Sequence, residues 1–320
     1  MSRGNLIPSA GGNSAMLLSA ALERFFFARA TTVTSPMTRG HYVRAVRWVS
    51  EALGREATLA DLNDETLVFL LAWLQKTRGQ TPNTVNTTHK NLCCLWRWCR
   101  DKGLVFTGPT VKPIRAPRRV PRALSHDEFS RIVAAAYRMT GTIGGLPASV
   151  WWVTLLQLCT NTGMRSGELL SLEWQFINWD RGWLIVPAEL RKGKYEDGTY
   201  ALWPETLAWL SQYRKNEGRI LGWERDRSRY WDLWNNLLDA AGLPKGRELK
   251  TQALRRTFAT VVDLNGGDAS RALGHADPTM AKKHYIDPSA RPAVDESSHI
   301  PGEWRPLGIV GPNGEVRRHG

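Results

Sequence analysis

The sequence has few cysteines and no long apolar run. Its 320 residues include four cysteines, none in a C-x-x-C pair and none with a histidine at metal-ligand spacing. This pattern argues against a zinc site and a disulfide framework, and we expect no metal and no other cofactor. No stretch approaches the roughly 18 apolar residues of a membrane-spanning helix. The apolar run at residues 15–30 is interrupted by Glu23 and Arg24, unlike a signal peptide. We therefore expect a cytoplasmic protein with no membrane partner.

Acidic residues are also in short supply. Thirty Asp and Glu stand against 43 Lys and Arg, which leaves a formal net charge of +13. Such an excess indicates a polyanionic partner, nucleic acid before membrane, although a merely basic protein would show the same charge. The length favours two domains, each with its own core.

Residues 15–106 are predicted to form an all-helical domain after a flexible N-terminus at residues 1–14. Helices are expected from about Met16 to Arg29, from Pro36, after a cap at Asn63, and from Pro82 to Gly103. Basic side chains on their outer faces make this domain a candidate DNA-binding module, with a solvated basic surface as the alternative. The outward residues of this kind are Arg44, His89, Lys90 and Arg97.

Residues 107–122 are predicted to form a basic, Pro-rich linker. Four prolines exclude regular helix and sheet there. A neutral tether would need no charge, so we interpret the segment as lying along a phosphate backbone, with a solvated tether as the alternative. Its cations are Lys112, Arg115, Arg118, Arg119 and Arg122.

Residues 123–290 are predicted to form an α+β domain. Ser125 and Glu128 form a capping-box pattern, and an apolar helix is expected over residues 149–160. Two strand-like runs, near residues 183–186 and 200–202, indicate a small antiparallel sheet. Helices are expected after Pro204, over 227–241 and over 251–265. Residues 291–320 form a C-terminal tail, for which we expect packing on a neighbouring subunit through Trp304 and the apolar residues after it.

Charged residues stand in apolar or tightly turned settings at several points of this second half. Arg165 follows an apolar helix in TGMRSGELL, with Glu168 one turn on and well placed to orient it. Arg255 lies in the otherwise apolar helix LRRTFAT. A buried arginine needs an anion, and either a protein carboxylate or a bound phosphate would serve. In HADPTMAKKHY, Asp277 and Pro278 predict a short helix that carries Tyr285 about two turns along.

Three segments of the chain resemble the signature segments of the tyrosine recombinases, also called the phage integrase family. They are, in this order, TGMRSGELLSL, LRRTFAT and LGHADPTMAKKHY, and the basic RKGK hairpin lies between the first two. The resemblance implies a mainly α chain: a helical core-binding domain and an α+β catalytic domain like that of type IB topoisomerases. It implies a phage or mobile-element integrase that binds double-stranded DNA, in the nucleoid of a prokaryotic host. Such an enzyme cuts and rejoins DNA through a 3′-phosphotyrosine, as a homo-tetramer, without metal or ATP.

Residue roles follow from the same resemblance. Arg165 and Arg255 would clamp the scissile phosphate, His275 would hydrogen-bond it, and Tyr285 would be the nucleophile. Glu168 would support the site from beneath. The proton for the leaving 5′ oxygen would come from Lys192, with Lys194 as its rival.

The sequence departs from the family pattern before Arg255. Gln252 stands where the family usually has a histidine, and Arg256 stands where another histidine commonly follows. An amide can hydrogen-bond a phosphate oxygen but cannot accept the proton of the tyrosine, which predicts a slower enzyme. His284 is a candidate substitute, although adjacent helical residues point about 100° apart. A type IB topoisomerase activity, or a DNA-binding protein with weakened catalysis, are the alternative functions.

Overall fold

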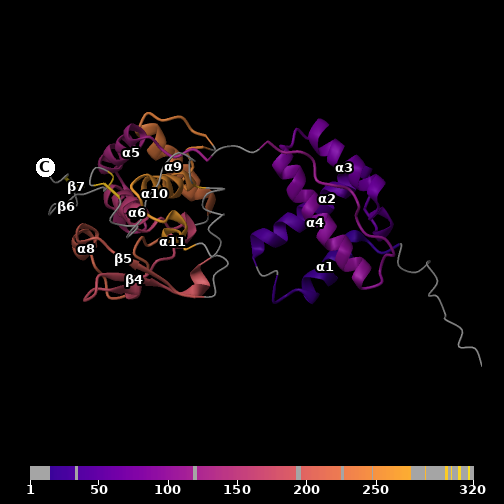
Figure 1. The fold of residues 1–320 in the computed structure, drawn as a ribbon, viewed down its shortest axis with the longest axis horizontal. Coiled ribbons are helices and arrows are strands. Elements are labelled where there is room, and N and C mark those ends of the chain that lie inside the picture. Colours follow the sequence, from indigo (N-terminus) through magenta and orange to yellow (C-terminus); the bar gives the residue numbers. More distant parts are fainter. Residues whose placement is uncertain are drawn as a thin grey trace, which may run out of the picture. The chain divides into compact units, whose positions relative to one another are not determined.

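The chain forms two compact units, residues 1–119 and 120–320 (Figure 1). The division lies inside the segment predicted as the linker. The structure is a computed structural model, and it describes residues 15–32, 35–117, 121–191, 196–224, 227–246, 248–274, 285, 300–301, 304, 309–310 and 316–317.

The described residues of the first unit form four helices, as predicted: α1 (Leu18–Ala28), α2 (Pro36–Leu53), α3 (Asp64–Lys76) and α4 (Pro82–Asp101), with a 3-10 turn η1 (Leu59–Asp61) between α2 and α3. Proline occupies the first position of α2 and α4, where its fixed φ suits a helix and its missing N–H costs no hydrogen bond. Gly54 ends α2 with a left-handed φ of 66°.

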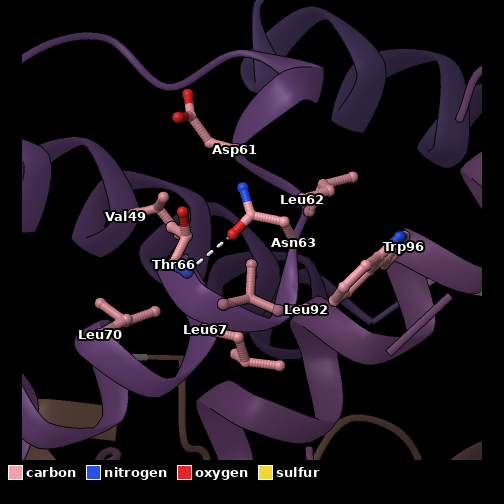
Figure 2. Close-up of a pocket in the computed structure, with 9 residues that line it drawn as sticks. All are labelled: Val49, Asp61, Leu62, Asn63, Thr66, Leu67, Leu70, Leu92 and Trp96. Atoms are coloured by element: carbon pink, nitrogen blue, oxygen red, sulfur yellow. Dashed lines mark hydrogen bonds between the residues drawn. The ribbon is translucent and has the colours of Figure 1, made fainter. Parts of the chain in front are cut away.

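The start of α3 shows how local signals and packing agree in this unit. Asn63 caps the helix through its side-chain oxygen, which accepts a hydrogen bond from the backbone N–H of Thr66 at 2.8 Å. Figure 2 shows this cap beside the small hollow that it helps to line. The apolar wall of the hollow comes from three helices, with Val49 on α2, Leu67 and Leu70 on α3, and Leu92 and Trp96 on α4.

Residues 107–117 lie on the first unit as an extended strap without regular secondary structure. Asn86 holds Ile114 at both polar atoms, accepting from its N–H and donating to its carbonyl oxygen, each at 2.9 Å. The carboxylate of Asp64 accepts from the backbone N–H of Thr110 at 3.0 Å. The strap is therefore part of this unit's packing up to residue 117.

The prediction that His89 faces outward is wrong. Its side chain is 7% exposed, and its Nε2 donates to the carbonyl oxygen of Val111 at 2.8 Å. The strap covers this part of α4, and the sequence periodicity of α4 contained no sign of that cover. His89 is thus a buried anchor for the strap, while its neighbour Lys90 stays exposed.

Over its described residues, the second unit consists of helices with three small antiparallel sheets, which confirms the predicted fold class. Its helices are α5 (His126–Arg138), α6 (Ala148–Thr162), α7 (Ser166–Leu169), α8 (Pro204–Ser211), α9 (Arg227–Ala240), α10 (Gln252–Leu264) and α11 (Ala269–Ala272), and its 3-10 turns are η2 (Trp174–Phe176) and η3 (Ala188–Leu190). Ser125 caps α5 in the predicted capping box with Glu128. Every residue of α6 is buried, and α6 lies in the middle of the unit, packed against α5, α8 and α10 (Figure 1).

The predicted strand pair is confirmed, with one further strand beside it. The sheet has the order β3 (Ile177–Asn178), β4 (Trp183–Val186) and β5 (Gly198–Ala201), all antiparallel. Along β4, Leu184 and Val186 are buried while Trp183 and Ile185 face outward, the alternation of a sheet with one covered face. Two-stranded pairs are formed by β1 (Thr142–Ile143) with β2 (Leu146–Pro147), and by β6 (Ile309–Val310) with β7 (Val316–Arg317).

The described part of the C-terminal tail packs on its own chain. Ile300 is 2% exposed in a small apolar cluster with Phe258 and Val262 of α10. The ring of Trp304 lies 5.1 Å from that of Phe129 and 5.0 Å from that of His126, both on α5. Trp304 therefore packs within its own chain, in an apolar groove between α5 and α10. Packing of the tail on a neighbouring subunit stays a prediction.

Replacing Asn86 by alanine should loosen the strap. The change removes both side-chain bonds to Ile114, each worth about 1 kcal/mol net, so we expect the amide of Ile114 to exchange with solvent about tenfold faster or more. Hydrogen exchange read at that amide, with trypsin cleavage after Arg115, measures the effect.

Two further variants make this test specific. Asn86→Asp keeps the acceptor for the Ile114 N–H and loses the donor to its carbonyl oxygen. The exchange rate of the Ile114 amide in this variant should therefore lie between those of the wild type and Asn86→Ala. Asn83→Ala changes an exposed side chain in the first turn of the same helix and should leave the exchange rate unchanged. Equal protection of Ile114 in the wild type and Asn86→Ala would contradict the proposed clamp.

Candidate active site around helix α10

Arg255 is the most buried charged residue of the candidate site. It is 2% exposed on α10, and its two terminal nitrogens donate to backbone carbonyls, Nη1 to Gly163 at 2.6 Å and Nη2 to Leu273 at 3.3 Å. Gly163 ends α6, and Leu273 follows α11. One guanidinium thus holds the ends of two helices, a task that suits its planar fork of donors.

Gly163 is a position where only glycine fits. Its φ is +61°, in the left-handed region, and a Cβ built there would lie 2.3 Å from the ring of Phe258. The close approach of α10 to this turn brings the Gly163 carbonyl within reach of Arg255. Sequence reasoning missed this role, although the signal was present as a glycine directly after an apolar helix.

Arg165 is the N-cap residue of α7, where the prediction that Glu168 orients it is confirmed. The Glu168 carboxylate accepts from the Arg165 backbone N–H and from Nη1, both at 3.0 Å. The Glu168 side chain is 8% exposed while that of Arg165 is 28% exposed. The carboxylate therefore lies beneath the arginine, whose guanidinium reaches toward solvent.

The two arginines influence each other electrostatically. Burial lowers the pKa of Arg255, and the positive charge of Arg165 lowers that pKa further. The negative charge of Glu168 and the hydroxyl of Tyr285 act in the opposite direction. Two guanidinium groups held this close in a largely apolar setting form a site that favours an anion with several oxygens, such as a phosphate.

Tyr285 lies against α10 beside these arginines. Its hydroxyl oxygen accepts a hydrogen bond from Nε2 of Gln252 at 3.2 Å. The guanidinium carbon of Arg255 lies 5.4 Å from the centre of its ring, and Thr260 donates to its backbone carbonyl at 3.1 Å. The structure therefore brings together four residues predicted from the sequence: Arg165, Gln252, Arg255 and Tyr285.

Arg256, noted in the sequence only as a departure from a pattern, donates hydrogen bonds to backbone carbonyls outside this cluster. Its Nε donates to the carbonyl oxygen of Arg122 at 2.7 Å, and its Nη2 donates to that of Glu248 at 2.5 Å. Burial lowers the pKa of Arg256, nearby Glu248 and Tyr285 raise it, and the charge of Arg122 lowers it. Sequence reasoning missed these contacts, because nothing in a local pattern shows which distant carbonyl an arginine reaches.

Four predicted residues, Lys192, Lys194, His275 and His284, lie outside the described residues. The residues directly before Lys192 and His275, Arg191 and Gly274, are described, and they meet. The Nη2 of Arg191 lies 2.9 Å from the place a Cβ on Gly274 would occupy, and its Nη1 donates to the Glu196 carbonyl at 2.6 Å. The residue before Lys192 is therefore in contact with the residue before His275.

The candidate DNA-contacting cations differ in their surroundings. Lys90, Arg97, Lys112 and Arg115 are exposed. Arg44 is half-buried, with its guanidinium over the ring of Trp48 at 5.5 Å. Arg122 is exposed and paired with Glu128 at 2.5 Å. Arg118 and Arg119 lie outside the described residues.

Over the described part of the chain, no cluster of three or more His, Cys, Asp or Glu side chains has an arrangement that could hold a metal ion. None of the helices within the same part has the length and apolar character needed to cross a membrane.

The chain matches known proteins over most of its length. A family model described as phage integrase family matches residues 122–291. Tyrosine recombinase XerA of Thermococcus kodakarensis is 27% identical over 230 residues, covering 68% of this chain and 75% of that protein. The defective protein IntQ of Escherichia coli (strain K12) is 23% identical over 188 residues, and the match spans only 44% of its length.

Solved structures share the fold. A lambda integrase dimer bound to a COC′ core site superposes with a TM-score of 0.63 at 20% identity, covering 83% of this chain and 97% of that one. The Tn1549 transposon integrase in complex with transposon right end DNA gives 0.66 at 12% identity, covering 86% and 96%. A lambda integrase tetramer bound to a Holliday junction gives 0.65 at 20% identity, covering 89% and 82%.

Replacing Gly163 by alanine should destabilise the second unit. The left-handed backbone and the overlap with Phe258 together predict a loss of about 2–5 kcal/mol in the free energy of unfolding. Gly167→Ala is the matched control, because it lies in the neighbouring α7 with no atom within 4 Å of the added Cβ. Denaturant unfolding of the full chain measures both variants, and a Gly163→Ala protein as stable as Gly167→Ala would contradict the close contact.

Proposed function

Since the chain belongs to the phage integrase family, we propose that it is a site-specific recombinase that cuts and rejoins duplex DNA through a covalent bond to Tyr285. The observation that carries the proposal is the cluster on α10. There the tyrosine ring lies 5.4 Å from the guanidinium of Arg255, and the charge of Arg165 lies close enough to lower the pKa of Arg255. A nucleophile beside two phosphate-binding cations is the arrangement that transfer of a phosphodiester requires.

In the proposed reaction, Arg165 and Arg255 hold the non-bridging oxygens of one DNA phosphate. The hydroxyl oxygen of Tyr285 attacks phosphorus in line with the leaving 5′ oxygen, which forms a 3′-phosphotyrosine and breaks the bond to that oxygen. Lys192, or Lys194 in its place, gives a proton to the leaving oxygen, and His275 hydrogen-bonds the phosphate. The phosphotyrosine keeps the bond energy, so rejoining by the reverse reaction needs neither ATP nor a metal.

Gln252 distinguishes this site from the common pattern of the family. Its amide nitrogen donates to the tyrosine oxygen, so it can stabilise negative charge that develops there. It cannot accept the proton, which passes instead to solvent or to another base. A general base contributes about 10²- to 10⁴-fold, so we propose an active but slow enzyme, with His284 as a candidate substitute base.

DNA binding is proposed for the exposed cations of both units and of the segment between them. Lys90, Arg97, Lys112 and Arg115 are free to meet phosphates, and Arg44, Arg118, Arg119 and Arg122 complete the set proposed from the sequence. For assembly we propose a homo-tetramer on two DNA segments, as in the lambda integrase tetramer on a Holliday junction. A phage or another mobile element is the proposed origin.

Two other functions remain as outcomes of the tests. A type IB topoisomerase would use the same chemistry on one DNA segment and relax supercoils without exchanging strands. A DNA-binding protein without cleavage is the other, because the missing general base at Gln252 weakens the attack.

The first test captures the covalent intermediate. The protein is incubated with a pool of nicked duplexes of randomised sequence, in which the fragment carrying the leaving 5′ hydroxyl is lost after cleavage, and adducts are recovered under denaturing conditions. Wild type should form adducts at one preferred sequence, and Tyr285→Phe, which keeps the ring and loses the nucleophile, should form none. Arg165→Lys and Arg255→Lys should slow adduct formation by about 10²-fold or more, because the bidentate contact is lost.

The outcomes separate the functions. Sequence-selective binding without any adduct would leave only the DNA-binding function. Adducts followed by plasmid relaxation, without exchange between two recovered sites, would favour the topoisomerase.

Replacing Gln252 by histidine should speed cleavage. A neutral imidazole can take the tyrosine proton, so we expect a gain of about tenfold or more at pH 8, measured as single-turnover cleavage of a recovered duplex. The gain should vanish below about pH 6.5, where the imidazole is protonated and cannot act as a base.

Gln252→Ala is the control for the hydrogen bond alone. It removes the donor to the tyrosine oxygen and should cleave about tenfold more slowly than wild type. Cleavage by Gln252→His that is no faster than wild type at any pH would mean that proton removal from Tyr285 does not limit the rate.

A further inference from the structure

Helix α10 holds two different parts of the second unit. Gln252, Arg255 and Thr260 contact Tyr285 and the turns of the candidate active site. Arg256 and Thr257, consecutive residues of the same helix, contact the segment through which the chain enters the unit. That segment, residues 121–124, directly follows the proposed DNA-contacting strap and linker.

The entry segment is fixed to α10 at two backbone groups. Nε of Arg256 donates to the carbonyl oxygen of Arg122 at 2.7 Å, and the Thr257 hydroxyl accepts from the N–H of Leu124 at 2.8 Å. The latter bond is buried, and Leu124 itself is 4% exposed. A displacement of residues 122–124 must therefore either break these bonds or move α10.

The Arg256 contact needs a guanidinium. Its Nη2 also donates to the carbonyl oxygen of Glu248 at 2.5 Å, so one rigid fork spans carbonyls from two separate segments. A lysine has one nitrogen at the end of a flexible chain and cannot match both directions with the same geometry. Arg256 thus joins the entry segment, the segment before α10 and α10 itself.

We propose that Arg256 is a positioning residue that couples the placement of the entry segment to the active site. The inference rests on the proposed function, because it concerns the rate at which Tyr285 attacks DNA. When Arg122 binds the phosphate backbone, the position of residues 122–124 is set by the DNA. Through Arg256 and Thr257 this position is passed to α10, and the adjacent Arg255 moves with the helix.

The size of the rate loss expected for Arg256 variants follows from the precision with which the reaction needs its catalytic groups placed. A misplacement of about 1 Å in a catalytic group can cost about 10²-fold in rate. Arg255 follows any shift of α10 directly, because the two arginines are neighbours on one rigid helix. DNA bound correctly by the linker would therefore hold Arg255 in the productive position.

The experiment is a double-mutant cycle on a duplex recovered by the adduct selection. Single-turnover cleavage at saturating protein is compared for wild type, Arg256→Ala, the linker variant Arg122→Gln, which keeps the backbone carbonyl that Arg256 contacts, and the combination. Arg256→Ala should slow cleavage by about 10- to 100-fold in the wild-type background but by no more than about threefold in the linker variant.

Control variants separate positioning from folding. Arg256→Lys should cleave faster than Arg256→Ala and more slowly than wild type. Thr257→Val, which loses the acceptor for the Leu124 N–H, should also slow cleavage more in the wild-type background than in the linker variant. Arg138→Ala, at an exposed site at the end of α5, should cleave at the wild-type rate. Thermal unfolding of each full-length protein verifies that it is folded.

Three results would overturn the inference while leaving the proposed function intact. In the first, Arg256→Ala slows cleavage by the same factor in the wild-type background and in the linker variant. In the second, it slows cleavage in neither background. In the third, the linker variant alone cleaves at the wild-type rate at saturating protein. A wild-type protein that forms no Tyr285-dependent adduct would instead refute the proposed function itself.

Discussion

The active site of this protein depends on a buried guanidinium. Removing a charge from water costs several kcal/mol, and Arg255 is 2% exposed. Carbonyl oxygens at the ends of α6 and α11 accept hydrogen bonds from the guanidinium and offset part of this cost. The negative charge of the Glu168 carboxylate also stabilises the positive charge of Arg255. The arrangement nevertheless places Arg165 close enough to oppose the charge of Arg255, so the two arginines with Glu168 keep a net positive charge. An anionic phosphate would relieve that repulsion, which supports the proposal that one binds here.

The apolar side of α10 makes this burial possible. Phe258 packs against Gly163 so closely that no side chain fits there, and this contact sets the distance over which Arg255 reaches the carbonyl. On the polar side, Gln252, Arg256 and Thr260 follow one another at a spacing of four residues, so they lie along one stripe of the helix. Residues of a single stripe therefore hold the tyrosine at its hydroxyl and at its backbone carbonyl, and also the entry segment. A helix with this many attachments transmits displacement as a rigid element.

Local chemistry made much of this structure predictable. The caps at Asn63 and Ser125, the strands and the Arg165–Glu168 pair all follow from residues a few positions apart, and all are confirmed. Contacts between distant segments were not predictable. His89 was placed outward because its helix shows no sign of the strap that covers it. The contact of Gln252 with the tyrosine oxygen spans 33 positions, and that of Arg256 with Arg122 spans 134. Sequence patterns identify the types of residue at the site, whereas only the fold decides which of them meet.

The position of Gln252 also bears on the balance between cutting and rejoining. In the proposed reaction the tyrosine oxygen carries partial negative charge in one transition state, which the attack and its reversal share. An amide N–H donated to that oxygen lowers this barrier in both directions by the same amount. Stabilising this shared transition state alone leaves the equilibrium between intact DNA and phosphotyrosine unchanged, and only a difference in the Gln252 contact between the two end states would shift it. A missing base slows both directions equally. In the proposed reaction, a glutamine at position 252 would therefore slow cutting and rejoining together, and the loss of the base would not by itself make cut ends accumulate.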